Sequence, residues 1–271
     1  MKMKKNLNFV LGAILVAAIL LAAVVSYFWL PFDPKTINFA DQLKPPSTTH
    51  WLGTDHFGRD LFSRLLVGAR GTLYVGLIAV GIALSIGSFL GLIAGFFGGI
   101  LDEVIMRLSD TFYAFPAILM ALLLAAIFGP STQTAMTAIG IATIPIFARL
   151  MRSSTLSVKN LPYIEAARAL GMGKLRIIFR HVLPNTISPI IVQASLSLAV
   201  AVLAEAALSY LGLGSPPDVP SWGNMLREAK GFMNMSVYPA LVPGLAIVIT
   251  VLGWGLLGDG LRDVLDPHNN D

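Results

Sequence analysis

The stretch that decides the fold is residues 71–101, GTLYVGLIAVGIALSIGSFLGLIAGFFGGIL, which contains no charged residue. About 20 apolar residues in a helix suffice to cross the hydrocarbon core of a bilayer. This stretch therefore predicts a membrane span over about residues 72–98. The rest of the chain has the same character, since 55% of its 271 residues are hydrophobic and only 13% are charged.

A stripe of glycines marks one face of this predicted span. Gly87, Gly91, Gly95 and Gly99 recur every four residues, so they share one side of a helix. Small residues in this pattern let the backbone of a second helix approach closely. The alternative is the ordinary tolerance of membrane helices for glycine.

Five more charge-poor blocks predict further spans. The first block could be a cleaved signal peptide, but its apolar run is too long and lacks a small-residue cleavage site, which favours a retained anchor. The uncharged run over residues 111–148 is too long for one crossing, and Gly129 and Pro130 divide it. The sequence thus predicts an all-α integral membrane protein of about six transmembrane helices, with the other spans at residues 8–30, 114–129, 132–150, 186–208 and 238–258.

Charge and cysteine content exclude several classes of function. The net charge is +4. If the N-terminus is inside, the segments on the cytoplasmic side of the spans contain more lysine and arginine than the segments on the outer side. By the positive-inside rule, this predicts two cytoplasmic termini, and it explains the basic balance without a nucleic-acid partner. The chain has no cysteine, so disulfides and thiolate metal sites are excluded.

The longest predicted cytoplasmic loop covers roughly residues 149–181. Pro162 is well placed to begin a helix, strong helix formers follow, and Gly171 interrupts them. From the residues alone, this could be a docking helix or an interfacial helix with a solvated basic face.

The spacing within this loop resembles a known motif. Glu165, Ala166 and Ala167 are followed by Gly171 and then by Leu183 and Pro184. The pattern resembles the EAA loop of binding-protein-dependent ABC importer permeases of the type I fold, although His181 stands where isoleucine is usual. The resemblance implies a coupling helix seated in a groove of a separate ATPase. Small Ala166 and Ala167 permit close seating, Glu165 offers a charge, and Gly171 allows a sharp turn.

Three other segments resemble one branch of that family, the C-type permease subunits for dipeptides, oligopeptides, glutathione or nickel. They are residues 50–64, HWLGTDHFGRDLFSR, residues 205–223, EAALSYLGLGSPPDVPSWG, and residues 258–267, GDGLRDVLDP. The resemblance implies an N-terminal anchor and outer amphipathic segment over residues 1–70, the importer transmembrane domain over 71–260, and a cytoplasmic tail over 261–271.

Charged residues in the first of these segments have helical spacing. Asp55, Arg59, Asp60 and Arg64 alternate in sign, which predicts an ion-paired helix on the outer surface. His50 and His56 could bind a metal together with Asp55. The ligand spacing expected of a histidine metal site is absent, so we predict no metal site.

Glu205 is the only acidic residue inside a predicted span. Such residues are costly in a membrane, which suggests a role in the gate or pathway, a local bond to the loop at residues 212–222, or an interfacial position.

The chain lacks its own machinery for ATP. The nearest candidate for a phosphate loop, around Gly173 and Lys174, has Arg168 where the first glycine belongs and Leu175 where serine or threonine belongs. We therefore expect no catalytic residues and no cofactor on this chain, with ATP and Mg bound by partner subunits. A gradient-driven carrier or channel, or a membrane enzyme, would be the alternatives.

The resemblance implies a multi-pass subunit of the bacterial cytoplasmic membrane that pairs with a homologous second permease. Two ATPase subunits would bind inside, and an extracytoplasmic binding protein would deliver the solute outside. The resemblance also implies that selectivity lies largely with that binding protein, so the sequence leaves the choice between peptide, glutathione, nickel and metal chelate open.

Overall fold

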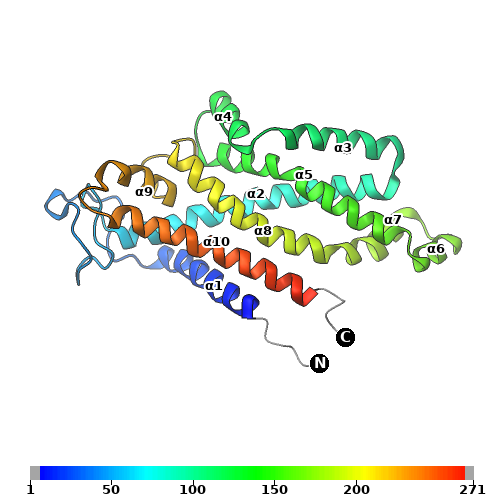
Figure 1. Ribbon diagram of the computed structural model, residues 1–271, viewed down its shortest axis with the longest axis horizontal. Helices are drawn as coiled ribbons and strands as arrows, with labels where there is room; N and C mark the ends of the chain where they lie inside the picture. Colours follow the sequence, from blue (N-terminus) through cyan, green and yellow to red (C-terminus); the bar gives the residue numbers. More distant parts are fainter. Residues whose placement is uncertain (1–6, 266–271) are drawn as a thin grey trace.

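The computed structural model describes residues 7–265, and within this range the chain is helical and contains no strand. Five long helices lie side by side along the longest axis (Figure 1). Each is long and apolar enough to cross a membrane, which confirms the predicted class. These helices are α1 (Leu7–Phe28), α2 (Leu61–Phe97), α5 (Thr132–Lys159), α8 (Leu183–Tyr210) and α10 (Tyr238–Leu265).

The third predicted span, residues 114–129, contains a helix that is too short to cross the membrane alone. This helix is α4 (Ala117–Phe128), and the preceding helix, α3 (Gly99–Ala114), is bent by 85° relative to it. Phe115 and Pro116 between them have extended backbone, with ψ of 123° and 133°. The 12 residues of α4 reach only about 18 Å, short of the roughly 30 Å hydrocarbon core. The chain has six spans if the bent pair counts as one.

The helices also extend beyond their predicted bounds. α2 begins at Leu61 rather than near residue 72, because the Asp60 carboxylate caps it by accepting a hydrogen bond from the Ser63 N–H at 2.8 Å. The domain boundary predicted between residues 70 and 71 therefore lies inside α2. A helical run from Lys174 leads into α8 through α7 (Lys174–Ile177) and a π-helical turn, η2 (Ile178–Val182).

The two ends of the bundle differ. One end carries the short helix α6 (Pro162–Ala169), and the start of α1 and the end of α10 point toward it (Figure 1). The other end carries the segment at residues 29–60, with η1 (Phe39–Asp41), and α9 (Trp222–Ala229), with η3 (Lys230–Phe232). Of the predicted tail, residues 261–265 belong to α10, and the rest lies outside the described residues.

Candidate functional site

The α6 helix holds the predicted EAA residues at the tip of one end of the bundle (Figure 1). Pro162 occupies its first turn, where the missing N–H costs nothing. Ile164 is fully buried and Ala167 is 6% exposed, and both belong to the hydrophobic core that α2, α5 and α8 share. Glu165 and Ala166 are exposed. The helix is therefore anchored by one face, and its other face is exposed.

Gly171 ends this helix with a specific hydrogen-bond pattern. Its N–H donates to the Arg168 carbonyl at 2.9 Å, and the Met172 N–H donates to the Ala167 carbonyl at 3.1 Å. These two bonds form a Schellman motif, which needs a residue in the left-handed region at the position of Gly171. Its φ of +77° supplies that conformation. Nothing lies within 4 Å of a Cβ added there, so glycine is needed for conformation and not for space.

Large apolar side chains are exposed at the end of α6 and in the α7 and η2 segments that follow it. Leu170 is 86% exposed, Leu175 68% and Phe179 64%. Exposed apolar side chains of this kind mark either protein–protein or membrane interaction sites. Leu183 and Pro184 form the first turn of α8, where Leu183 is half-buried and Pro184 is exposed.

Three of the four stripe glycines lie against α5. A Cβ on Gly87 would lie 2.5 Å from the Ile144 carbonyl oxygen, and one on Gly91 would lie 2.2 Å from that of Ala148. At Gly95 it would meet the Thr155 Cβ at 2.8 Å. Gly99 is not part of this contact, because α2 ends before it and its φ is +60°.

Replacing Gly91 with alanine should destabilise the α2–α5 contact by about 1–3 kcal/mol, because the added methyl has no space beside the Ala148 carbonyl. Gly81 is the matched control on the same helix, since nothing lies within 4 Å of its Cβ position. Thermal unfolding in detergent should give a lower midpoint for Gly91→Ala than for Gly81→Ala. Equal midpoints would contradict tight packing at this stripe.

Glu205 is 1% exposed and lies inside α8. Its carboxylate accepts hydrogen bonds from the Ser209 Oγ at 2.8 Å and from the Thr72 Oγ1 of α2 at 3.3 Å. The Ser209 Oγ in turn accepts from the Ser215 N–H at 3.2 Å. Glu205 thus links α8 to α2 and, through Ser209, to the loop at residues 212–222. A role in the gate or pathway stays a prediction.

The outer segment does not form the predicted surface helix. Asp55 and Arg59 lie in the irregular chain before α2 and Arg64 lies in its first turn, and all three are buried, with exposures of 3%, 9% and 2%. The expected pairing of Asp55 with Arg59 is confirmed at 2.6 Å. Arg59 and Arg64 have a second anionic partner, Glu228 of α9. It is distant from them in sequence and was not predicted.

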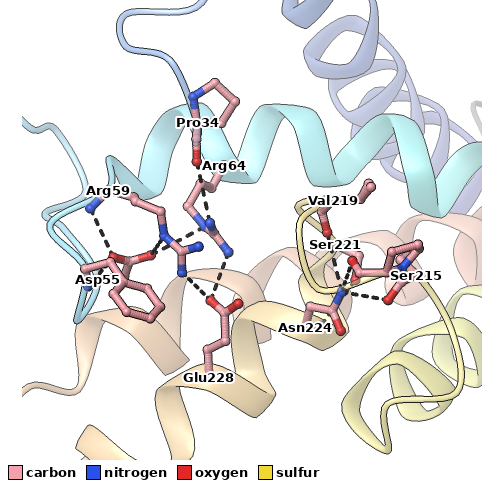
Figure 2. Close-up of polar contacts among 11 residues, drawn as sticks. Pro34, Asp55, Arg59, Arg64, Ser215, Val219, Ser221, Asn224 and Glu228 are labelled. Carbon is pink, nitrogen blue, oxygen red and sulfur yellow. Dashed lines mark hydrogen bonds and ion pairs between the residues drawn. The ribbon is translucent and has the colours of Figure 1, made fainter. Parts of the chain in front are cut away.

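Glu228 holds both guanidinium groups, as Figure 2 shows. Its Oε2 accepts from the Arg59 Nη2 at 2.5 Å and from the Arg64 Nη2 at 3.0 Å. The two carboxylates and two guanidinium groups balance in charge, which buried ions require. We call Asp55, Arg59, Arg64 and Glu228 the outer ion network. It joins the segment before α2 to α9.

A group of side chains that could hold a metal ion overlaps the outer ion network. Ligand atoms of Asp55, His56 and Glu228 lie within 4.8 Å of one another. Arg59 and Arg64 already pair with the two carboxylates, so a cation would have to displace them. Burial lowers the pKa of His56 below its usual value. We therefore interpret the group as an ion-pair network.

Asn224, another residue that the sequence analysis missed, organises the loop before α9. Its Nδ2 donates to the carbonyls of Ser215 and Pro216, both at 3.0 Å, and to that of Val219 at 3.4 Å (Figure 2). Ser221 caps α9 by accepting from the Asn224 N–H. A sequence signal existed, because serine before a short amphipathic helix is typical of an N-cap.

A bundle of helices long and apolar enough to span a membrane, with a short exposed helix at one end, defines a polytopic membrane protein. The family of binding-protein-dependent transport system inner membrane components matches residues 87–270, and the chain belongs to this family. It is a multi-pass inner-membrane transport subunit and not an enzyme. The segment before α2, which holds half of the outer ion network, lies outside the matched residues.

Relatives with assigned names indicate which branch of this family the chain resembles. The chain is 45% identical to the dipeptide transport system permease of Alkalihalophilus pseudofirmus, over 98% of this chain and 88% of that protein. It is 44% identical to the glutathione transport system permease of Pectobacterium atrosepticum, over 94% and 86%. A probable D,D-dipeptide transport system permease of Escherichia coli K12 is 40% identical, over 95% and 87%. These relatives confirm the predicted resemblance to the peptide branch.

Solved structures share the fold. A chain of the MetNI methionine ABC transporter in an inward-facing conformation matches with a TM-score of 0.63 and 20% identity, over 75% of this chain and 96% of that one. An amino acid ABC transporter crystallised with histidines matches with a TM-score of 0.58 and 18% identity, over 74% and 94%. At this identity, the likeness shows the fold alone.

Proposed function

We propose that this chain is a permease subunit of an ATP-driven importer for dipeptides or closely related short peptides such as glutathione. It forms half of the pathway together with a homologous second permease subunit. The identity of 40–45% to dipeptide and glutathione permeases over nearly the whole chain carries this proposal. Nickel and metal chelates, which the wider branch also includes, have no such relative among these proteins.

Coupling to ATP takes place at α6. Glu165 and Ala166 face outward on a helix whose other face is buried, and exposed Leu170 adds apolar surface beside them. A separate ATPase subunit that binds ATP and Mg seats on this surface, and closure of two such ATPases moves the permease helices. Both termini and α6 lie in the cytoplasm, because the start of α1 and the end of α10 are directed toward the end of the bundle that carries α6 (Figure 1).

The opposite end of the bundle receives the extracytoplasmic binding protein. The segment at residues 29–60 and α9 form this end, and the outer ion network holds them together. The outer ion network lies beneath the surface that the binding protein contacts first. By fixing the segment at residues 29–60 against α9, it holds this docking surface in one conformation.

Co-purification of the chain from its native membrane tests this function. We expect a complex with a second permease and ATPase subunits whose hydrolysis increases when a peptide-loaded binding protein is added. Mass spectrometry of the ligand on that binding protein then identifies the substrate. Recovery of the chain without an ATPase, together with uptake driven by an ion gradient, would refute the proposal.

A further inference from the structure

The apolar packing of α3 against the rest of the bundle is incomplete. Within α3, Ser109 is the one buried residue. A cavity of about 190 Å³ lies between this helix and its neighbours, and its lining includes Leu108 and Phe112 of α3 and Ile144 of α5. Close packing normally fixes how one helix lies against another, so other contacts must set the position of α3.

The corner that leads from α2 into α3 does not hold α3 in place either. Gly98 and Gly99 have φ of +69° and +60°, both in the left-handed region. None of the described atoms lies within 4 Å of a Cβ added at either position. Because a glycine pair in open space has wide backbone freedom, this corner permits more than one direction for α3.

A bidentate ion pair supplies the missing contact. Arg152, in the second half of α5, donates from Nε to the Asp102 Oδ1 at 2.5 Å and from Nη2 to Oδ2 at 2.7 Å. Asp102 lies in the first turn of α3. Two parallel hydrogen bonds from one guanidinium group fix an orientation as well as a distance. The start of α3 is therefore fastened to α5.

A second ion pair between the same helices is weaker. Arg149 of α5 contacts Asp110 of α3 at 2.7 Å, through one nitrogen, and these side chains are 43% and 64% exposed. The side chains of Arg152 and Asp102 are 35% and 17% exposed. Because solvent weakens an exposed pair, the contact of Arg152 with Asp102 is the stronger of the two.

The last residue of α5 makes another link to the same corner. The Lys159 Nζ donates to the Gly95 carbonyl oxygen at 2.6 Å. This carbonyl belongs to the last turn of α2, where backbone acceptors lack helical donors and the helix dipole favours a cation. The end of α5 thus holds the chain on both sides of the glycine corner, α2 before it and α3 after it.

The same end of α5 leads directly into α6, the proposed site of coupling. Two residues separate the helices. Arg168 of α6 donates from Nη2 to the Lys159 carbonyl at 3.3 Å, and its guanidinium carbon lies 5.9 Å from the ring centroid of Phe96 in α2. A displacement of α6 therefore acts on the end of α5 and, through Arg152 and Lys159, on the corner.

We propose that Arg152 is a positioning residue which, by holding Asp102, makes α3 move together with the end of α5 when an ATPase displaces α6. This inference rests on the proposed function, and it names the contact that carries the movement from α5 to α3. Without the pair, α3 pivots freely at Gly98 and Gly99. Movement of α5 then no longer sets the direction of α3.

The ratio of peptide uptake to ATP hydrolysis tests the proposal. It is measured on the assembled transporter in proteoliposomes, with the peptide that mass spectrometry identifies on its binding protein. We expect Arg152→Gln to lower this ratio about fivefold. A charged hydrogen bond corresponds to about tenfold or more in an equilibrium constant, and the partial exposure of Arg152 reduces that effect. Retention of the ATPase and its stimulated hydrolysis should stay unchanged, because α6 itself is intact.

Arg107→Gln is the matched control, because Arg107 pairs with Glu103 on α3 itself and does not reach α5. The double variant Asp102→Arg with Arg152→Asp exchanges the two charges and should restore part of the ratio. Equal ratios in Arg152→Gln and Arg107→Gln would overturn the proposal, and so would a lowered ratio that the exchange does not raise. If Arg152→Gln does not assemble, Arg152→Lys decides, since it keeps the charge and loses the bidentate geometry. A wild-type ratio in Arg152→Lys would then overturn the proposal.

The wild-type complex separates this inference from the proposed function. Peptide uptake and stimulated hydrolysis by the wild-type complex, together with an unchanged ratio in Arg152→Gln, would refute the role of Arg152 and leave the importer function standing. Absence of the ATPase or of ATP-driven uptake in the wild-type complex would refute the function itself.

Discussion

Replacing Gly171 with valine is expected to reduce binding-protein-stimulated ATP hydrolysis by about tenfold or more. Gly171 has a φ of +77°, a conformation that costs an L-residue about 1–2 kcal/mol and is worst for a β-branched one. The Schellman bonds at the end of α6 would be lost or strained, and the exposed face with Glu165 would change its direction. A change of 1.4 kcal/mol corresponds to about tenfold in affinity, so docking on the ATPase should weaken accordingly.

Two further variants distinguish the effect of the backbone conformation at Gly171 from the effect of side-chain size. Gly173→Val adds the same side chain two residues later, where φ is −64° and nothing lies within 4 Å of the Cβ position, so it should leave the helix end intact. Gly171→Asn should recover part of the activity, because asparagine tolerates the left-handed region. ATPase retention on the purified complex and stimulated hydrolysis are the measurements. Normal coupling in Gly171→Val would refute the coupling role of this helix end.

Glu228→Ala should destabilise the protein by about 3–5 kcal/mol, the cost of removing one partner from a buried ion pair. The change leaves Arg59 and Arg64 buried with Asp55 as their remaining anion in the network. The denaturant midpoint in detergent should fall, and proteolysis should become faster within residues 29–60, which the network holds against α9.

The pair of Glu103 with Arg107 on α3 is the matched control. These side chains are 60% and 78% exposed and their closest N and O atoms lie 2.7 Å apart, so Glu103→Ala should cost less than about 1 kcal/mol. Combining Glu228→Ala with Arg64→Met should recover part of the loss, because it removes one uncompensated charge. Equal effects of Glu228→Ala and Glu103→Ala would show that the outer ion network does not stabilise this end of the bundle.

The sequence was sufficient wherever the controlling interaction is local. Hydropathy located the five long spans, because lipid selects apolar side chains at each position separately. Pro162 and Gly171 marked the ends of α6, because each acts on its own backbone. The spacing of Glu165 and Gly171 and the three branch segments then indicated the family that the relatives confirm.

Other features depend on residues that are far apart in the chain. Arg59 and Glu228 are separated by 169 positions, and nothing near Arg59 shows that a carboxylate of α9 neutralises it, so the sequence suggested a solvated helix. The bend at Pro116 was hidden inside an apolar run whose hydropathy favours a straight span. Only the tertiary structure decided these points, because burial of a charge and the direction of a broken helix depend on which distant segments pack together.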